Sequence, residues 1–183
     1  MGSYYLELYL SKSNPLTEEE LEALKESLET FKAEAPEAAF WLDGPRLVVT
    51  NEIDECISPE VLVGPPGATY PLNGEIPNLI YAGKMYGVLT LSVEDCNRTY
   101  LCPRGPELHY EDGANFLPLH LESYLKHPEE ALSELLNKAG RARKFMERLE
   151  TDTACWPKKV LAEVLTEEEI ARGEVKCQGG RDG

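Results

Sequence analysis

The chain has few positive charges. It contains 18 Lys and Arg residues against 33 Asp and Glu, which gives a net charge of −15 over 183 residues. Nearly all of the excess precedes Tyr124, because residues 124–183 hold 12 acids and 11 bases. Such a charge repels nucleic-acid phosphates and anionic lipid, and it attracts basic proteins at low salt. We therefore expect no direct nucleic-acid binding and no membrane contact, and we expect a basic protein as partner.

Long apolar runs and closely paired cysteines are also missing, and we expect no secretory leader. No apolar stretch approaches the roughly 20 residues that cross a bilayer, and the N-terminus leads directly into a strand-like segment. The five cysteines are an odd number without a CxxC pair, namely Cys56, Cys96, Cys102, Cys155 and Cys177. This usage is typical of a reducing compartment, so we predict a cytoplasmic protein.

No motif in the sequence selects a reaction. The patterns G-x-S-x-G and H-E-x-x-H and the dinucleotide fingerprint are absent. The Gly/Pro-rich residues 64–69 lack the Lys-Ser or Lys-Thr ending of a phosphate loop, and their prolines remove backbone donors. We expect no cofactor and no metal. Two weak alternatives stay open, which are zinc held by Cys96, Cys102 and His109, and a cysteine nucleophile with His109 or His120 as its base.

The first part of the chain predicts a strand, a helix and two further strands. Apolar residues alternate over 4–10, which predicts a half-buried strand. Thr17 and Glu20 have the spacing of a capping box, so we expect a helix from there to about Ala33. A short hairpin is predicted over 39–50, with its turn at an Asp-Gly-Pro sequence. This order is compatible with a ferredoxin-like start.

The second part predicts more strands and a long helix. Residues 64–77 are half glycine and proline, which indicates an irregular loop inside one domain covering residues 1–183. The remaining elements are strands at 79–82, 85–93, 99–102 and 107–110, a helix from His127 to about Leu149, and a short helical tail at 157–183. We predict a single α+β domain, in which an antiparallel or mixed sheet of about five to seven strands carries the two main helices on one face.

The first predicted helix has an acidic face. At about 100° per residue, its apolar stripe lies almost opposite a row of carboxylates, formed by Glu18, Glu22, Glu26 and Glu29. Like charges one turn apart destabilise an isolated helix by a few tenths of a kcal/mol per pair. The row is therefore either an ordinary solvated face or a surface for a basic partner.

A basic group lies late in the second main helix. Arg141, Lys144 and Arg148 share the polar face, whereas Arg143 points toward an apolar stripe. Bases near a helix C-terminus stabilise the helix through its macrodipole, which is one interpretation. The other is a contact with the acidic half of a second copy or with a phosphorylated ligand. Arg143 needs a carboxylate partner if it is buried.

These features favour a non-catalytic interaction protein that binds and occludes a basic protein, of the immunity-protein or phage-inhibitor type. The residues expected to bind the partner are the four glutamates of the first helix, together with Arg141, Lys144 and Arg148. One alternative is an enzyme or small-ligand binder with a pocket near 96–110, where Cys102, Glu107, His109 and Tyr110 would converge. Another is a homo-oligomeric structural subunit, in which the basic helix of one copy meets the acidic helix of the next.

Overall fold

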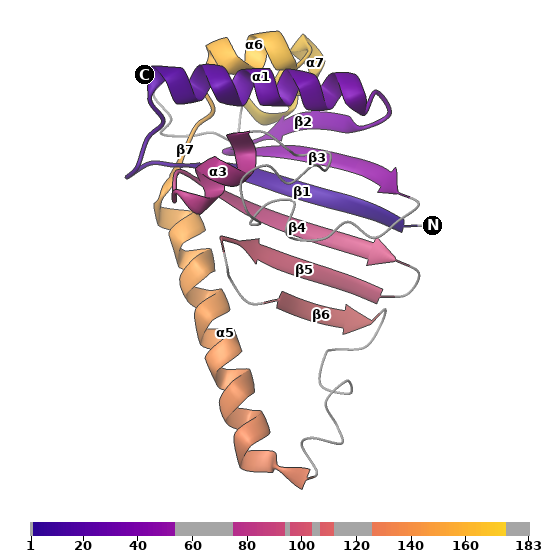
Figure 1. The fold of residues 1–183 in the computed structure, drawn as a ribbon, viewed down its shortest axis with the longest axis vertical. Helices are drawn as coiled ribbons and strands as arrows, with labels where there is room; N and C mark the ends of the chain where they lie inside the picture. Colours follow the sequence, from indigo (N-terminus) through magenta and orange to yellow (C-terminus); the bar gives the residue numbers. More distant parts are fainter. Residues whose placement is uncertain (1, 54–74, 94–95, 104–106, 112–125, 175–183) are drawn as a thin grey trace.

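The computed structural model describes residues 2–53, 75–93, 96–103, 107–111 and 126–174, and it shows a β-sheet with helices on both faces (Figure 1). Its strands are β1 (Gly2–Ser11), β2 (Ala39–Asp43), β3 (Arg46–Ile53), β4 (Met85–Val93), β5 (Cys96–Cys102), β6 (Glu107–Glu111) and β7 (Thr153–Ala154). Its helices are α1 (Glu18–Glu34), α3 (Glu75–Tyr81), α5 (Pro128–Thr151), α6 (Lys158–Val164) and α7 (Glu167–Glu174).

The sheet is antiparallel throughout its described pairs. The strands lie in the order β2-β3-β1-β4-β5-β6, and the short β7 also pairs with β1. The predicted α+β class and antiparallel sheet are confirmed. The hairpin predicted over 39–50 is also confirmed as β2 and β3, and its turn contains Gly44 at a φ of 64°.

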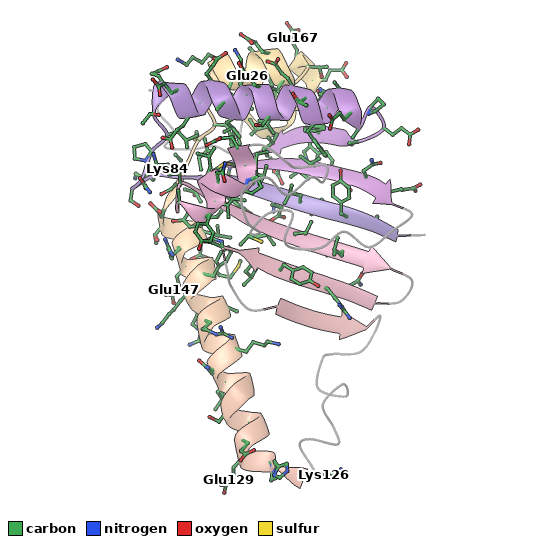
Figure 2. All side chains as sticks on the ribbon, in the orientation of Figure 1. Glu26, Lys84, Lys126, Glu129, Glu147 and Glu167 are labelled. Atoms are coloured by element: carbon green, nitrogen blue, oxygen red, sulfur yellow. The ribbon has the colours of Figure 1, made fainter. Side chains whose placement is uncertain are left out.

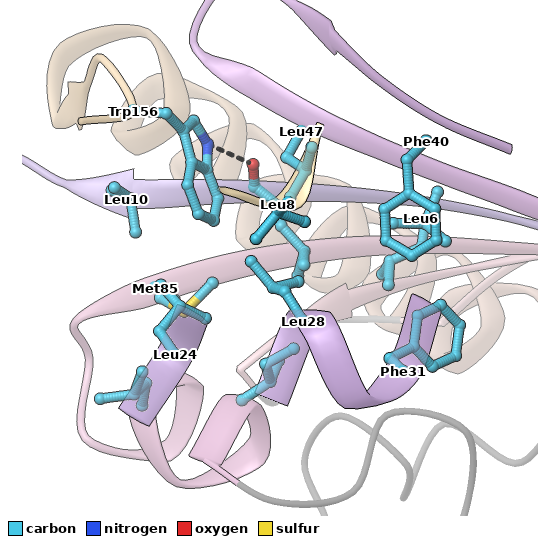
Figure 3. Close-up of a cluster of buried hydrophobic side chains, with 14 of the residues drawn as sticks. Leu6, Leu8, Leu10, Leu24, Leu28, Phe31, Phe40, Leu47, Met85 and Trp156 are labelled. Carbon is cyan, nitrogen blue, oxygen red and sulfur yellow. Dashed lines mark hydrogen bonds between the residues drawn. The ribbon is translucent and has the colours of Figure 1, made fainter. Parts of the chain in front are cut away.

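β1 lies at the centre of the sheet because β3 and β4 pair along nearly its whole length. Its alternate residues Leu6, Leu8 and Leu10 face the helices α1, α3 and α6, and they form the larger hydrophobic core with them (Figure 3). Trp156 enters this core from the segment before α6, and its Nε1 donates to the Leu8 carbonyl at 3.3 Å. The alternation of apolar residues predicted over 4–10 therefore determines which face of β1 contributes to the larger core.

A second, smaller core lies on the other face of the sheet. There Tyr9 of β1 and its register partner Tyr86 of β4, together with Leu101 of β5, pack against Phe145 and Leu149 of α5. The two main helices thus lie on opposite faces, and the prediction that both cover one face is wrong. The physical reason is that β1 and β4 carry large aromatic residues near one end, at positions that face away from the larger core. These residues make that end of the second face apolar enough to bury.

The strand predicted at 79–82 is wrong, because residues 79–81 belong to the helix α3 and Ala82 lies in the turn after it. Apolar residues spaced one turn apart, Ile76, Leu79 and Ile80, are buried in α3 against the larger core. Pro77 lies in the first turn of this helix, where a missing N–H costs no hydrogen bond. Gly83 follows at a φ of 77°, so the chain ends the helix in a left-handed conformation and leads into β4.

The remaining predicted elements agree with the structure where it describes them. The strands predicted at 99–102 and 107–110 are β5 and β6, and the long helix is α5, which begins at Pro128 after His127 as N-cap. The helical tail is α6 and α7, and residues 175–183 lie outside the described residues. Most of the predicted loop at 64–77 also lies outside them, and its last residues belong to α3.

The described cysteines differ in state. Cys102 is a free, buried thiol, whereas Cys155 is disulfide-bonded. The expected reducing compartment therefore stays a prediction. Among the described helices, none has the length and apolar composition that a membrane span requires.

Asp152 joins the end of α5 to the loop after β1. Its carboxylate accepts hydrogen bonds from the Ser11 hydroxyl at 2.8 Å, the Ser13 backbone N–H at 2.7 Å and the Tyr86 hydroxyl. Partial burial favours the neutral acid, but these hydrogen bonds outweigh it and lower the pKa of Asp152 to about 2. The charged carboxylate is therefore part of what holds α5 against the sheet.

Replacing Asp152 with Asn should lower the free energy of unfolding at pH 7 by about 1 kcal/mol, because an amide cannot accept all three bonds and water screens part of their strength. The native pKa lies below the ordinary value, so this contribution is present above about pH 4 and is lost as the pH falls toward 2. Urea unfolding between pH 2 and pH 7 measures it. A gap between wild type and variant that stays constant with pH would contradict this role, and Glu147→Gln on the exposed side of α5 is the control.

Replacing Leu24 with Ala should cost about 3 kcal/mol, since the fully buried side chain leaves a cavity between α1 and the sheet. The matched control is Leu136→Ala, whose side chain is 63% exposed and whose loss should cost less than about 0.5 kcal/mol. Equal losses of unfolding free energy in the two variants would contradict the described core.

Candidate functional site

The predicted acidic face lies on the outer side of α1. Thr17 caps the helix, because its Oγ1 accepts from the Glu20 N–H at 3.2 Å while the Glu20 carboxylate accepts from the Thr17 N–H at 2.9 Å. Leu24, Leu28 and Phe31 are buried on the sheet side of the helix. The opposite side therefore faces outward, and all members of the acidic face are exposed, namely Glu18, Glu22, Glu26 and Glu29 (Figure 2 labels Glu26).

Two of these four glutamates pair with lysines of the same chain. Lys159 of α6 contacts Glu18 at 2.8 Å, with both side chains largely exposed. Lys25 contacts Glu22 at 2.8 Å and Glu163 of α6 at 2.9 Å, and these two hydrogen bonds raise the pKa of Lys25. The acidic face is thus partly neutralised along the line where α6 packs against α1.

The other two glutamates make no ion pair with any described residue. Glu26 and Glu29 are exposed on the outer side of α1, closer to the C-terminal end of the helix than the two paired glutamates. With Glu163 included, this region contains five carboxylates against two lysines, so three negative charges remain. The exposed Glu167 of α7 lies at the same end of the molecule and extends the acidic surface (Figure 2).

A small pocket follows the line between α1 and α6. It has a volume of about 130 Å³ and is lined by Glu18, Leu21, Glu22, Lys25, Lys159, Val160 and Glu163. Sites for metabolites or cofactors are typically several hundred Å³. This pocket therefore admits a side chain or a few waters, and it does not have the size of a substrate site.

Further lysines tie α1 to its neighbours. Lys32 donates to the Val164 carbonyl at 2.8 Å and to Glu169 at 3.0 Å. Partial burial alone would raise the pKa of Glu169, but hydrogen bonds from the Thr166 N–H and Lys32 lower it. On the other side of the helix, a hydrogen bond from Lys84 and the cap at Thr17 lower the pKa of Glu20. These contacts fix the helix in place and are structural.

The predicted basic residues lie on the other face of the sheet. Arg148 donates to the Tyr86 hydroxyl at 3.1 Å and stands 5.1 Å from the centre of the Tyr86 ring, so it helps to seat α5 on the sheet. Arg141 and Lys144 are exposed, and neither pairs with an acid in the described part of the chain. Arg143 is also exposed, so it needs no buried carboxylate. The structure does not bring these bases near the acidic face of α1, because the sheet separates the two helices.

Cys102 does not have the properties of a nucleophile. Burial raises the pKa of its thiol to about 12, so the thiol is protonated at neutral pH. In the register of β5 and β6, His109 lies opposite Arg98, four residues from Cys102 and roughly 13 Å away along the strand. A Cys102–His109 pair, as nucleophile and base or as joint zinc ligands, is therefore not supported by the backbone.

The other residues of these alternatives lie outside the described side chains. They are Glu107, His109 and Tyr110 of β6, together with Cys96 and His120. Among the described residues, no three His, Cys, Asp or Glu side chains come together as a metal site would require.

The sequence revealed the glutamates but not their partners. Lys159 and Glu163 belong to α6, more than 130 positions after the residues they meet on α1. Lys159 and Glu163 are four residues apart, which places them on one side of α6. This spacing is a local signal that they face the same neighbour, but it does not identify that neighbour. Pairing across such a distance follows from the packing of α6 on α1, which no local pattern specifies.

The comparisons with known proteins add no relatives. The chain matches no protein-family model, no curated protein and no solved structure. The geometry of its own surface is therefore the basis for a functional proposal.

Proposed function

We propose that this protein is a non-catalytic binding protein whose acidic α1 surface engages a basic protein partner. The observation that supports this is the outward position of Glu26 and Glu29, both exposed and without an ion pair to any described residue. Carboxylates one turn apart repel each other, and among the described residues this repulsion is offset by Lys159 of α6 at Glu18 and by Lys25 of α1 at Glu22. The uncompensated part of the row is the part that a partner would neutralise.

The binding mode would combine long-range attraction with steric cover. A net charge of −15 attracts basic proteins before contact, and this attraction weakens as salt screens it. At contact, α1 presents a rigid row of carboxylates. Its other side is anchored by buried leucines, and its Lys32 and Glu20 contact Glu169 and Lys84 of neighbouring segments. A partner whose functional groove is basic would be occluded, as in immunity proteins and phage-type inhibitors.

Lysines of the partner would compete with those of the protein itself. Lys159 and Glu18 are both largely exposed, and an exposed ion pair of this kind contributes little to stability. A partner lysine can therefore replace Lys159 at low cost and extend the contact along the whole row. Lys25 is held by two carboxylates and would remain in place.

The double variant Glu26→Gln/Glu29→Gln should slow association with a lysine-rich 16-residue peptide about fivefold at low salt, since each lost contact with a lysine weakens binding by up to about 1 kcal/mol. Stopped-flow fluorescence at about 20 mM and about 300 mM salt measures the association rate. The difference in rate between the variant and the wild type should shrink at the higher salt concentration.

The matched control is Glu37→Gln/Glu52→Gln, which removes the same charge from exposed positions outside the acidic face. The control should retain nearly the wild-type rate. If both double variants slow association equally, net charge alone governs binding and the acidic face of α1 has no special role.

A further inference from the structure

An apolar stripe along α5 is exposed to solvent. Leu132 is 51% exposed, Leu136 is 63% exposed and Met146 is 49% exposed, and Ala139 lies between them on the same side. At about 100° per residue these four residues fall within about 80° of one another. From Leu132 to Met146 the stripe is roughly 21 Å long, which is nearly four helical turns.

This stripe is separate from the contact of α5 with the sheet. The sheet contact uses Ala142, Phe145 and Leu149, which lie on the neighbouring side of the helix. The first turns of α5 project past the described strands, with Glu129 at the far end and Glu147 near the sheet (Figure 2). A helical segment shorter than about 12–15 residues is marginal in water without packing, so burial of the exposed stripe would stabilise the projecting half of α5.

Acidic residues border the stripe. The exposed Arg143 lies within the stripe, but three carboxylates outnumber it. Glu129 and Glu147 lie on the Leu136 side near the two ends of the stripe, and Glu150 continues the stripe beyond Met146. All three are exposed, and none pairs with a described residue. Glu150 is in the last turn of α5, where a negative charge opposes the helix macrodipole, so its position does not serve the stability of the helix.

We propose that this stripe binds the apolar side of a basic amphipathic helix from another protein. The leucines and the methionine would contact the apolar side of that helix, and its lysines or arginines would reach Glu129, Glu147 and Glu150. Methionine and leucine side chains adapt to different apolar partners, which suits such a surface. The proposal does not depend on the acidic face of α1, which lies across the sheet.

A second copy of the chain fits the stripe less well. Pairing two α5 helices in antiparallel fashion about Ala139 would place Glu129 of one copy near Glu147 of the other, which brings like charges together. The net charge of −15 adds a general repulsion between copies. A basic helix removes both penalties.

Fluorescence anisotropy of a labelled 18-residue Leu/Lys amphipathic peptide tests the proposal with the full chain. Leu132→Ser/Leu136→Ser should weaken binding about tenfold or more, because the apolar contact is lost. Glu147→Gln/Glu150→Gln should weaken it about threefold. The control Arg141→Ser/Lys144→Ser changes two exposed side chains on another side of the same helix and should bind no more weakly than wild type.

Three results would overturn the proposal. The first is unchanged affinity in the leucine variant, which would mean that the peptide binds by charge alone. The second is equal binding of a matched Leu/Glu peptide, which would exclude the predicted charge preference. The third is a wild-type dimer in sedimentation equilibrium that the leucine variant abolishes, which would assign the stripe to a second copy. Circular dichroism of each variant verifies that α5 remains folded.

Discussion

The fold depends on the two-sided burial of the central strand β1. Leu6, Leu8 and Leu10 point to the face covered by α1, α3 and α6, whereas Tyr9 points to the face that α5 covers. Because side chains alternate along a strand, a shift of register by one residue would exchange the two sets and place both cores on the wrong side. Pairing with β3 and β4 along nearly the whole strand prevents this shift. The faces of the sheet that α1 and α5 cover follow from that register.

The same constraint sets the electrostatics of the surface. Once Leu24, Leu28 and Phe31 are buried against the sheet, the carboxylates on the opposite side of α1 have to face outward. Among the described residues, lysines neutralise this row where Lys159 of α6 approaches Glu18 and where Lys25 of α1 bridges Glu22 and Glu163. Glu18 and Glu22 therefore take part in the packing of α1 on α6, whereas Glu26 and Glu29, farther along the helix, are exposed and make no ion pair with a described residue. That division is the physical basis for proposing that Glu26 and Glu29 bind the partner.

α5 illustrates the limit of helical periodicity. The sequence indicates one apolar stripe containing Leu132, Leu136 and Met146, and it is natural to expect that stripe in the core. In the structure the helix instead packs through Phe145 and Leu149 at its C-terminal end, next to Tyr86 and Asp152. The hydrogen bonds of Asp152 and the contact of Arg148 with Tyr86 hold this end in place. The main apolar stripe is left exposed, and its exposure is what gives α5 a candidate binding surface.

The sequence by itself determined the elements whose signals are local. The capping box at Thr17 and Glu20, the alternation in β1 and the hairpin of β2 and β3 all depend on neighbouring residues, and all appear as predicted. Tertiary packing decided the helical state of α3, because short apolar runs suit a strand or a helix equally. It also decided which face of the sheet α5 covers and which lysines meet the acidic face of α1. These outcomes depend on contacts between residues far apart in the chain, whose free energy no local pattern contains.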